Sequence, residues 1–310
     1  MRVVPFATFR VVTDLGSGHC TWFQPTVDKL YLASDRLYRL AKRRGRTPDE
    51  NIVMTGLPIR HDFAVQADLL GDRTTESGKA YQRQVKETLG LDTEKPMILV
   101  MGGGEGVGSL SSIVDELYRQ LTAAGIDATI CVVCGRNAKL QTELTEKDWS
   151  AVLAAEPPKR RRFGLFRRKE RRTHVPVSSD GPPGQVTVVG LGFITRMAEY
   201  MVAADVLVSK AGPGTIAEAA SVGLPVMLTS FLPGQEAGNV NFVLDKKFGE
   251  FHQDPIDIAR EVASWFQNPS VLESMSHHAK EAGNPNAAAE IVLDIGSTTH
   301  TWMALNQAAQ

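Results

Sequence analysis

Short apolar runs that alternate with helical stretches dominate the chain from residue 81 onward. Helical patterns over 81–89 and 109–124 are each followed by an apolar run, over 97–101 and 128–133 respectively. Short, continuously apolar strands separated by helices are typical of a parallel sheet that is covered on both faces. The pattern therefore predicts a doubly wound α/β domain.

The same alternation resumes after residue 185, with strands expected over 186–189, 206–208 and 226–228 and a helix over 197–203. Gly-rich loops follow the strands expected over 97–101 and 206–208. Ligands of doubly wound sheets bind where the carboxyl ends of strands meet the N-termini of helices. Both loops are therefore candidates for a binding site.

The first 80 residues are organised differently. A strand is expected over 10–13, followed by a helical stretch and a short strand over 51–54. The polar, unpatterned segment 60–80 is expected to connect two domains. Because the first strand comes almost at once, the sequence indicates a domain that is truncated at its start.

The charge and hydropathy of the chain disfavour some partners. The sequence has 34 basic and 35 acidic side chains, so no net field attracts it to nucleic acid or to a membrane. No stretch reaches the length of a membrane span, and the N-terminus lacks the order of a signal peptide. Any membrane contact is therefore expected to be peripheral.

A basic segment over 159–172 interrupts the α/β pattern and is flanked by paired prolines. Proline, glycine and like charges oppose packing, which predicts a disordered surface insertion over 155–185. Its basic residues and the interspersed Phe163, Leu165 and Phe166 could contact an anionic lipid surface. A solvated loop, or a retained stretch of coding sequence, is the alternative.

The three cysteines cannot form an even disulfide framework, which indicates a reducing compartment. Cys131 and Cys134 lie three positions apart in an apolar run, where strand geometry directs side chains to opposite faces. Buried packing is therefore expected for both, rather than a redox or zinc site.

The first Gly-rich loop, over 102–108, joins a strand to a helix, so its backbone N–H groups could face a phosphate. It does not fit the dinucleotide fingerprint, because Val107 stands where the third glycine belongs. A nicotinamide-dependent dehydrogenase is therefore disfavoured. Phosphate binding and a simple tight turn remain open for this loop.

The second Gly-rich loop, over 209–219, has small residues up to Thr215 that would let a ligand approach the backbone. The spacing of Thr215 and Glu218 also fits a capping box, in which Glu218 only satisfies backbone N–H groups. Spacing alone favours the capping box. A third loop, over 233–239, contains amide and carboxylate side chains that match sugar hydroxyls or an ordinary solvated turn.

Several short motifs follow one another along the chain. They are VTDL (12–15) with His19, Trp22 and Phe23, GLPIR (56–60), MGGGEG (101–106), CGRN (134–137), GFIT (192–195), KAGPGTIAEA (210–219), GLP (223–225) and PGQEAGN (233–239). Taken in order, these motifs resemble the monogalactosyldiacylglycerol synthases, which belong to glycosyltransferase family 28 together with the bacterial lipid II GlcNAc transferase. The resemblance runs from about residue 10 to residue 293, apart from the basic segment.

The resemblance implies a GT-B fold, in which two Rossmann-like domains face each other across a cleft. On this basis we expect a remnant of the acceptor domain over 1–75, a UDP-sugar-binding donor domain over 76–295 and a tail over 296–310. The implied reaction is an inverting transfer of galactose from UDP-galactose to diacylglycerol, without an obligatory metal or other cofactor.

The resemblance also implies roles for individual residues of the donor domain. The turn at Phe193 and Ile194 would receive the uracil, and Glu218 would hold the ribose hydroxyls, which reverses the preference for a capping box. The other implied contacts are Gly103, Gly104, Arg136, Gly214 and Thr215 with the diphosphate, and Gln235 and Glu236 with the galactose, with Asn239 nearby.

Four residues of the expected acceptor remnant are further candidates. Asp14 and His19 could form a carboxylate and imidazole pair for proton abstraction, or could cap and brace a loop. Trp22 and Phe23 could contact lipid or pack in the core, which is commoner for aromatic residues.

The general base of the family lies near a Gly-rich loop that ends in histidine, and that loop is absent from this sequence. We therefore expect the chain alone to bind UDP but to transfer galactose poorly. Membership of the family would place it peripherally at the plastid envelope. A related transferase using UDP-GlcNAc or UDP-glucose, or a catalytically incomplete protein that binds UDP-sugar or lipid, is the alternative.

Overall fold

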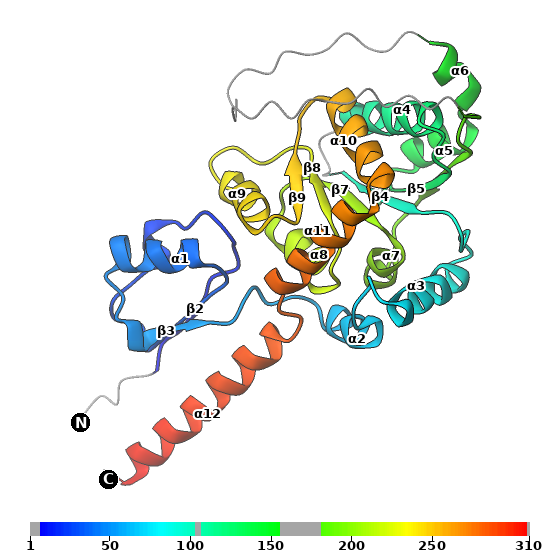
Figure 1. The fold of residues 1–310 in the computed structure, drawn as a ribbon. Coiled ribbons are helices and arrows are strands. Elements are labelled where there is room, and N and C mark those ends of the chain that lie inside the picture. The colour runs from blue at the N-terminus through cyan, green and yellow to red at the C-terminus, as the bar shows by residue number, and fades with distance from the viewer. Residues whose placement is uncertain (1–6, 103–106, 156–180, 309–310) are drawn as a thin grey trace.

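The computed structural model describes residues 7–102, 107–155 and 181–308, which form two parallel sheets (Figure 1). The smaller sheet has three strands in the order β1-β2-β3, and the larger has six in the order β6-β5-β4-β7-β8-β9. Gly103, Gly104 and the basic segment 159–172 lie outside the described residues. The strand order confirms the predicted doubly wound α/β domain.

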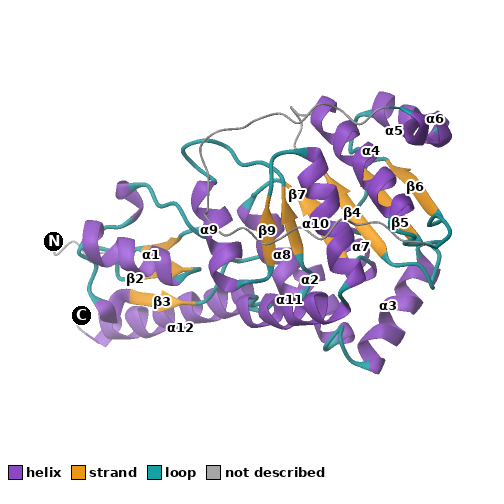
Figure 2. Ribbon diagram, turned by 45° about the horizontal axis from the view of Figure 1, so that its top comes forward, coloured by secondary structure: helices purple, strands orange, loops and turns teal. Residues whose placement is uncertain are grey.

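The four inner strands of the larger sheet are apolar and almost wholly buried, as the sequence pattern predicted, whereas the edge strands β6 and β9 are partly exposed. Helices cover both faces, and an apolar cluster lies on each (Figure 2). One cluster packs under α2, α3, α7, α8 and α9, and the other under α4, α5 and α10. The strands are β4 (Met97–Met101), β5 (Ala128–Val133), β6 (Val186–Leu191), β7 (Val206–Ser209), β8 (Val226–Leu228) and β9 (Gly249–Phe251).

The helices of the larger unit include several that the pattern did not predict, among them α5, α10 and α11. Their bounds are α2 (His61–Leu70), α3 (Glu76–Thr88), α4 (Val107–Ala123), α5 (Ala138–Glu146), α6 (Trp149–Ala154), α7 (Met197–Ala203), α8 (Pro213–Ser221), α9 (Ala237–Lys246), α10 (Pro255–Gln267) and α11 (Pro269–Ala282).

The two cysteines near the end of β5 lie on opposite faces of the sheet. Cys131 belongs to the cluster under α7 and α8, whereas Cys134 belongs to the cluster under α4 and α5. Both thiols are free, and burial raises the pKa of Cys131 to about 12. The predicted buried packing is therefore confirmed.

The smaller sheet contains β1 (Phe9–Val11), β2 (Lys29–Leu32) and β3 (Ile52–Met54), of which β2 was not predicted. Alternate residues of β2 point to opposite faces, as in any strand. Leu30 and Leu32 join a small core beneath α1 (Asp35–Leu40), which Ser34 caps by accepting a hydrogen bond from the Leu37 N–H at 3.2 Å. The smaller unit also contains two short 3₁₀ segments, η1 (Cys20–Trp22) and η3 (Asp49–Asn51), and a π segment, η2 (Ala41–Gly45).

The long helix α12 (Ala287–Ala308) runs from the larger unit past the smaller sheet (Figures 1 and 2). Tyr31 lies on the face of β2 opposite the small core and donates a hydrogen bond to Asp294 at 2.8 Å. Lys29 pairs with the same carboxylate at 2.6 Å. The smaller sheet is thus attached through α12, and the sequence assigned to a tail over 296–310 continues this helix to residue 308.

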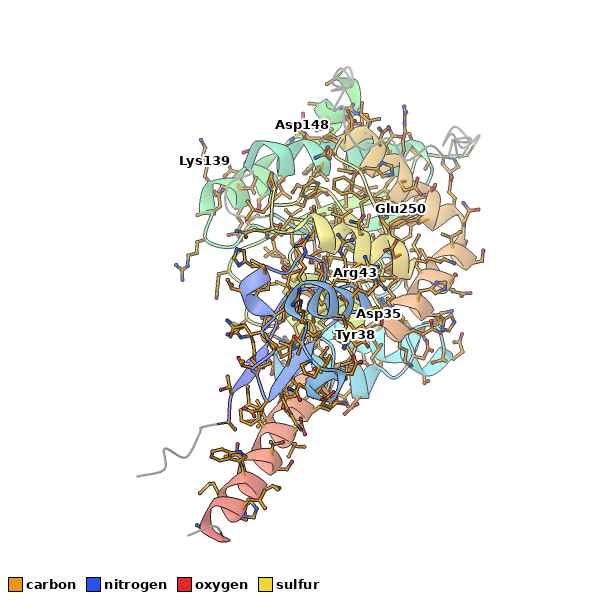
Figure 3. The ribbon with its side chains drawn as sticks, turned by 90° about the vertical axis from the view of Figure 1, so that its left-hand side faces the viewer. Asp35, Tyr38, Arg43, Lys139, Asp148 and Glu250 are labelled. Atoms are coloured by element: carbon orange, nitrogen blue, oxygen red, sulfur yellow. The ribbon has the colours of Figure 1, made fainter. Side chains whose placement is uncertain are left out.

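The smaller unit has a second contact with the larger unit, on the side of the molecule that Figure 3 shows. Asp35, at the start of α1, pairs with Lys246 of α9 at 3.4 Å. Both side chains are largely exposed, so this pair is screened by solvent and contributes little to stability.

The segment expected to be a connector over 60–80 is instead largely helical, which corrects the prediction. Within this polar segment Arg73, between α2 and α3, is buried and anchors the segment to the larger unit. Its guanidinium donates to the carbonyls of Met201, Ala204 and Val222 at 3.2, 2.6 and 2.8 Å. These carbonyls end α7 and follow α8, so Arg73 satisfies acceptors that a helix terminus leaves unpaired.

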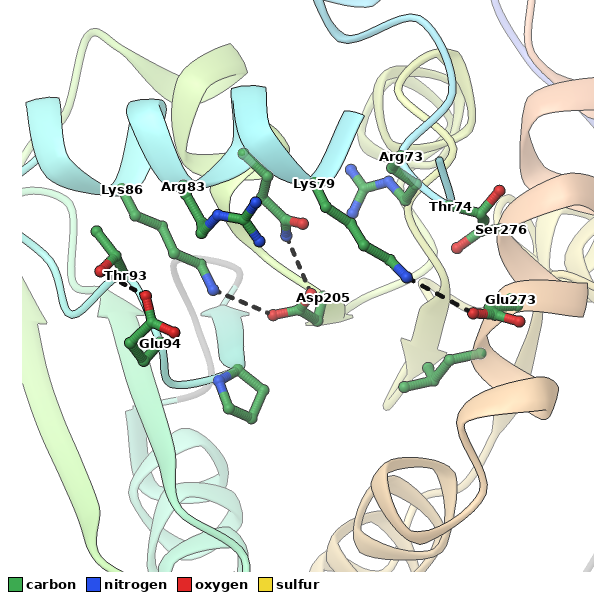
Figure 4. A pocket seen from close by; sticks show the side chains of 13 residues that line it. Arg73, Thr74, Lys79, Arg83, Lys86, Thr93, Glu94, Asp205, Glu273 and Ser276 are labelled. Carbon is green, nitrogen blue, oxygen red and sulfur yellow. Dashed lines mark hydrogen bonds and ion pairs between the residues drawn. The ribbon is translucent and has the colours of Figure 1, made fainter. Parts of the chain in front are cut away.

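A cavity of about 270 Å³ adjoins this anchor, between α3 and the amino ends of β4 and β7 (Figure 4). Lys86 donates to the Lys95 carbonyl at 2.8 Å and lies 3.5 Å from Asp205. Gln82 donates to the same carboxylate at 3.0 Å. These bonds brace α3 against the sheet, at the edge opposite the Gly-rich loops.

None of the helices in the described part of the chain combines the length and the apolar character of a membrane span.

Candidate functional site

The strand order of the larger sheet reverses between β4 and β7, because β5 and β6 lie on one side of β4 and β8 and β9 lie beyond β7. Such a reversal opens a crevice at the carboxyl ends of the strands, where ligands of doubly wound sheets bind. The two Gly-rich loops follow β4 and β7 and therefore flank this point. The third loop follows β8, at the same edge.

Helix α8 begins at Pro213, with Gly212 as its N-cap residue and no side-chain cap. Thr215 therefore lies inside the helix, and the capping-box interpretation is wrong. Proline at the first helical position lacks an N–H, but the next backbone N–H groups are not paired within the helix. Gly214 has no atom within 4 Å of the position a Cβ would take, so a ligand can approach the backbone there.

Glu218 lies further along α8, with only 12% of its side chain exposed. Its carboxylate accepts two hydrogen bonds from Arg60, from Nε at 2.8 Å and from Nη2 at 3.0 Å. Arg60 stands 5.0 Å above the ring of Phe63, in a cation–π contact. The hydrogen bond that Arg60 donates to Glu218 is the main cause that raises the pKa of Arg60.

Arg136 and Phe193 come from the ends of two neighbouring strands, β5 and β6. The guanidinium carbon of Arg136 lies 5.9 Å from the Phe193 ring centroid, and the ring is 69% exposed. Ile194 instead packs against the apolar cluster under α7. An exposed ring with a cation over one face offers a stacking surface for a planar base. The two residues predicted for uracil and phosphate therefore lie together.

The third loop contains Gln235 and Glu236, which differ in exposure. Gln235 is exposed, next to Gly234, whose φ of +82° favours glycine. Glu236 is 8% exposed and accepts from Lys210 Nζ at 2.6 Å and from the Leu232 N–H at 2.8 Å. Gln235 is thus free to reach a sugar, whereas Glu236 holds Lys210 beside the start of α8.

Asn239 is wholly buried, and its position near the donor sugar stays a prediction. Its Oδ1 accepts from the Leu15 N–H at 3.3 Å, and its Nδ2 donates to the Ala211 carbonyl at 3.1 Å. A Cβ added to Gly238 would lie 2.2 Å from the carbonyl carbon of Gly16. Asn239 and these two glycines therefore form a seam between the smaller unit and the donor loops.

Asp14 and His19 are each engaged locally, as the bracing alternative expected. Asp14 is 8% exposed, and its Oδ1 accepts from the N–H groups of Gly16 and Ser17 at 2.9 Å. His19 Nδ1 lies 2.8 Å from the Thr21 hydroxyl and caps η1. No hydrogen bond joins the two side chains in the structure as described. The geometry therefore favours a turn and a helix cap over a proton-abstracting pair.

The two aromatic candidates of the smaller unit also differ. Phe23 is 3% exposed and belongs to the small core, so it is a packing residue rather than a lipid contact. Trp22 is 38% exposed and lines a cavity of about 550 Å³ with Arg10 and Gln24, beside β1. Contact of Trp22 with an acceptor stays a prediction.

Arg60, Lys210 and Ser17 are site residues to which the motifs assigned no role. Ser17 accepts from the Gly238 N–H at 3.3 Å, across the seam. Arg60 and Glu218 are 158 positions apart, so no local spacing could pair them. The motif GLPIR did include Arg60, and a cation in a motif that follows a strand was the available signal.

Comparisons with solved structures support this architecture. MurG from Acinetobacter baumannii is similar, with a TM-score of 0.51 and 17% identity over 88% of this chain and 67% of that one. A UDP-GlcNAc 2-epimerase from Neisseria meningitidis, bound to UDP-GlcNAc, gives a TM-score of 0.53 and 14% identity over 87% of this chain and 62% of that one. The chain therefore has the GT-B fold.

Sequence comparisons are more specific. Residues 167–291 match the glycosyltransferase family 28 C-terminal domain, and residues 2–59 match monogalactosyldiacylglycerol synthase. Monogalactosyldiacylglycerol synthase 1 of Arabidopsis thaliana is 33% identical over 95% of this chain and 47% of its own length. A probable monogalactosyldiacylglycerol synthase 2 of Oryza sativa subsp. indica is 35% identical over 94% of this chain and 52% of its own.

The chain is thus similar to monogalactosyldiacylglycerol synthases over nearly all of its length, and it spans about half the length of these curated relatives.

Proposed function

We propose that the larger unit binds UDP-galactose and that the protein transfers the galactose to diacylglycerol. The names of its relatives support this activity, and the fold supports a nucleotide-sugar donor. The observation that carries the proposal is that α8, which contains Glu218, begins after β7 at the strand-order reversal, while the exposed Phe193 follows β6 at the same carboxyl edge of the sheet.

Each part of the site has a chemical role in this proposal. Phe193 stacks on the uracil, Glu218 accepts from the ribose hydroxyls, and Gln235 contacts the galactose. The N–H groups opening α8 and the cations of Arg136 and Lys210 face the diphosphate. Such preorganised donors stabilise the negative charge that develops on the departing UDP, so the proposal includes no obligatory metal.

Titration calorimetry with UDP tests the donor site. We expect the folded chain to bind UDP, and Glu218→Ala to weaken binding by about ten-fold or more, because hydrogen bonds to a charged group are lost. Glu87→Ala is the matched control, since Glu87 is an exposed glutamate on α3. Absence of UDP binding, or equal affinity of Glu218→Ala and the unmodified protein, would overturn the proposal.

The choice of donor and acceptor is a separate part of the proposal. UDP-GlcNAc is the main alternative donor, and competition between UDP-galactose and UDP-GlcNAc for the site decides between them. If UDP-GlcNAc binds at least as tightly, the galactose assignment fails. A related protein that holds UDP-sugar without transfer is distinguished by a transfer assay with diacylglycerol vesicles.

The relatives are named chloroplastic, which supports a location in plastids. We propose peripheral association with the envelope through anionic lipid, with the basic segment 159–172 as the contact. Flotation with anionic liposomes, with and without residues 157–172, tests this contact. Equal binding of the two forms would exclude the segment as the lipid-binding element.

A further inference from the structure

The ion pair between Arg60 and Glu218 joins two parts of the chain that have different tasks. Glu218 is in α8, at the proposed nucleotide site, whereas Arg60 ends the segment that leads from β3 of the smaller sheet to α2. Both carboxylate oxygens are engaged, one by Nε and the other by Nη2, at 2.8 and 3.0 Å. Arg60 is also fixed from below by the Phe63 ring.

This contact is not an ordinary surface ion pair. An exposed pair contributes little, because water screens both charges and two flexible side chains are ordered. Here the Glu218 side chain is only 12% exposed, although that of Arg60 is 55% exposed. A carboxylate removed from water needs hydrogen-bond donors, and the planar guanidinium supplies two in a fixed geometry.

The two-pronged hydrogen bond from Arg60, called the fork below, leaves part of the Glu218 carboxylate available to accept further hydrogen bonds. A carboxylate has about four acceptor positions, two on each oxygen. Arg60 occupies one position on each, so one position on each oxygen is left. A ribose presents two adjacent hydroxyls, and two adjacent acceptors of fixed orientation match them.

We propose that Arg60 is a positioning residue for ribose recognition, which rests on the proposed binding of UDP. Arg60 holds the Glu218 carboxylate in the orientation that accepts from both ribose hydroxyls, and does not itself contact the nucleotide. The segment that joins the smaller sheet to α2 thereby sets the geometry of the ribose site.

The test compares UDP with 2′,3′-dideoxy-UDP, which lacks both hydroxyls, by calorimetry on the full chain. Arg60→Gln is expected to weaken UDP by about ten-fold, because the orientation of the carboxylate is lost, and to leave dideoxy-UDP within about two-fold. Arg60→Lys keeps the charge but not the fork, so an intermediate loss for UDP is expected. Arg39→Gln, an exposed arginine of α1, is the matched control.

A double-mutant cycle separates action through Glu218 from direct contact. In a Glu218→Gln background, Arg60→Gln should cause no further loss of UDP affinity. Equal weakening of UDP and dideoxy-UDP would overturn the inference, since Arg60 would then act on the diphosphate or on the fold. Tighter UDP binding by Arg60→Gln would overturn it as well, because Arg60 would then compete with the ribose.

The outcome for the unmodified protein separates this inference from the proposed function. If the unmodified protein does not bind UDP, the proposed function fails and the inference fails with it. If it binds UDP and Arg60→Lys matches it in affinity, only the inference fails, because the fork is then unnecessary. Melting temperatures of the variants verify that each has folded.

Discussion

The six-stranded and the three-stranded sheets are stabilised in different ways. The larger sheet is buried between helices on both faces, and its central strands β4 and β7 are almost inaccessible. The smaller sheet has strands of three or four residues and one small apolar cluster. On its other face, Lys29 and Tyr31 attach it to α12 through Asp294.

The difference shows which unit depends on the other. A domain needs enough buried apolar surface to offset its chain entropy, and short sheets with one small core seldom have it. The smaller sheet compensates with specific contacts to the larger unit, at Asn239, at the seam of Gly16 and Gly238, and at Asp294. Removing these contacts should therefore loosen the smaller sheet and leave the larger intact.

The largest effect is expected from Gly238→Ala. The added Cβ would lie 2.2 Å from the backbone of Gly16, so the two units must separate. We expect the smaller sheet to lose about 3 kcal/mol of stability, the upper end of overpacking costs. Hydrogen exchange should accelerate at the amides of β1 and β2 and stay slow in β4 and β7.

Gly296→Ala is the control for this experiment. Gly296 is in α12, and no atom lies within 4 Å of the position its Cβ would take. Alanine there should be neutral or stabilise by up to about 1 kcal/mol. If Gly238→Ala accelerates exchange equally in both sheets, the two units unfold together, and the smaller sheet is not the dependent unit.

A smaller effect is expected from Asn239→Ala. The change leaves the Leu15 N–H and the Ala211 carbonyl without their buried partner, at a cost of about 2 kcal/mol. Exchange of the Leu15 amide should become fast, which is measurable residue by residue. Asn268→Ala removes a hydrogen bond at an exposed site and should cost about 0.5 kcal/mol. Similar costs for the two variants would contradict the special role of the seam.

The smallest effect is expected from Asp294→Asn. The hydrogen bond from Lys29 is the main cause that lowers the pKa of Asp294, with that from Tyr31 contributing. Because the pKa is lower in the folded state, the stabilisation is present above the ordinary carboxyl pKa and is lost as the pH falls through the folded value.

At about pH 7 the Asp294→Asn change should cost at most about 1 kcal/mol, since both partners are partly exposed. At about pH 3 the difference from the unmodified protein should shrink. Thermal unfolding of the two proteins at both pH values measures this. If the difference in stability between the two proteins persists unchanged in acid, the charge of Asp294 does not contribute to the attachment of α12.

Sequence patterns predicted the larger sheet because its elements are locally encoded. The runs that became β4, β5, β7 and β8 are continuously apolar, and their bounds were predicted to within a residue. β2 was missed because Lys29 and Tyr31, which reach Asp294 in α12, interrupt its apolar pattern. Segment 60–80 was missed because its anchor is a buried arginine, which a polarity pattern cannot distinguish from an exposed one.

The candidate site was predicted in part for the same reason. Phe193, Arg136, Gln235 and the start of α8 follow strands directly, so parallel topology brings them to one edge. Arg60, the partner of Glu218, and Leu15, one of the two partners of Asn239, lie more than a hundred positions away. Such contacts depend on how the two units dock, which no local pattern encodes.

The placement of Cys131 and Cys134 on opposite faces of β5 provides two natural reporters, one in each helical layer. Both thiols are buried, and burial raises the pKa of each. An alkylating reagent can therefore reach a thiol only when the helical layer that covers it opens. A reagent that modifies Cys134 before Cys131 would show that the layer of α4 and α5 opens first. The order of labelling thus shows which helical layer of the larger unit opens first, without any engineered probe.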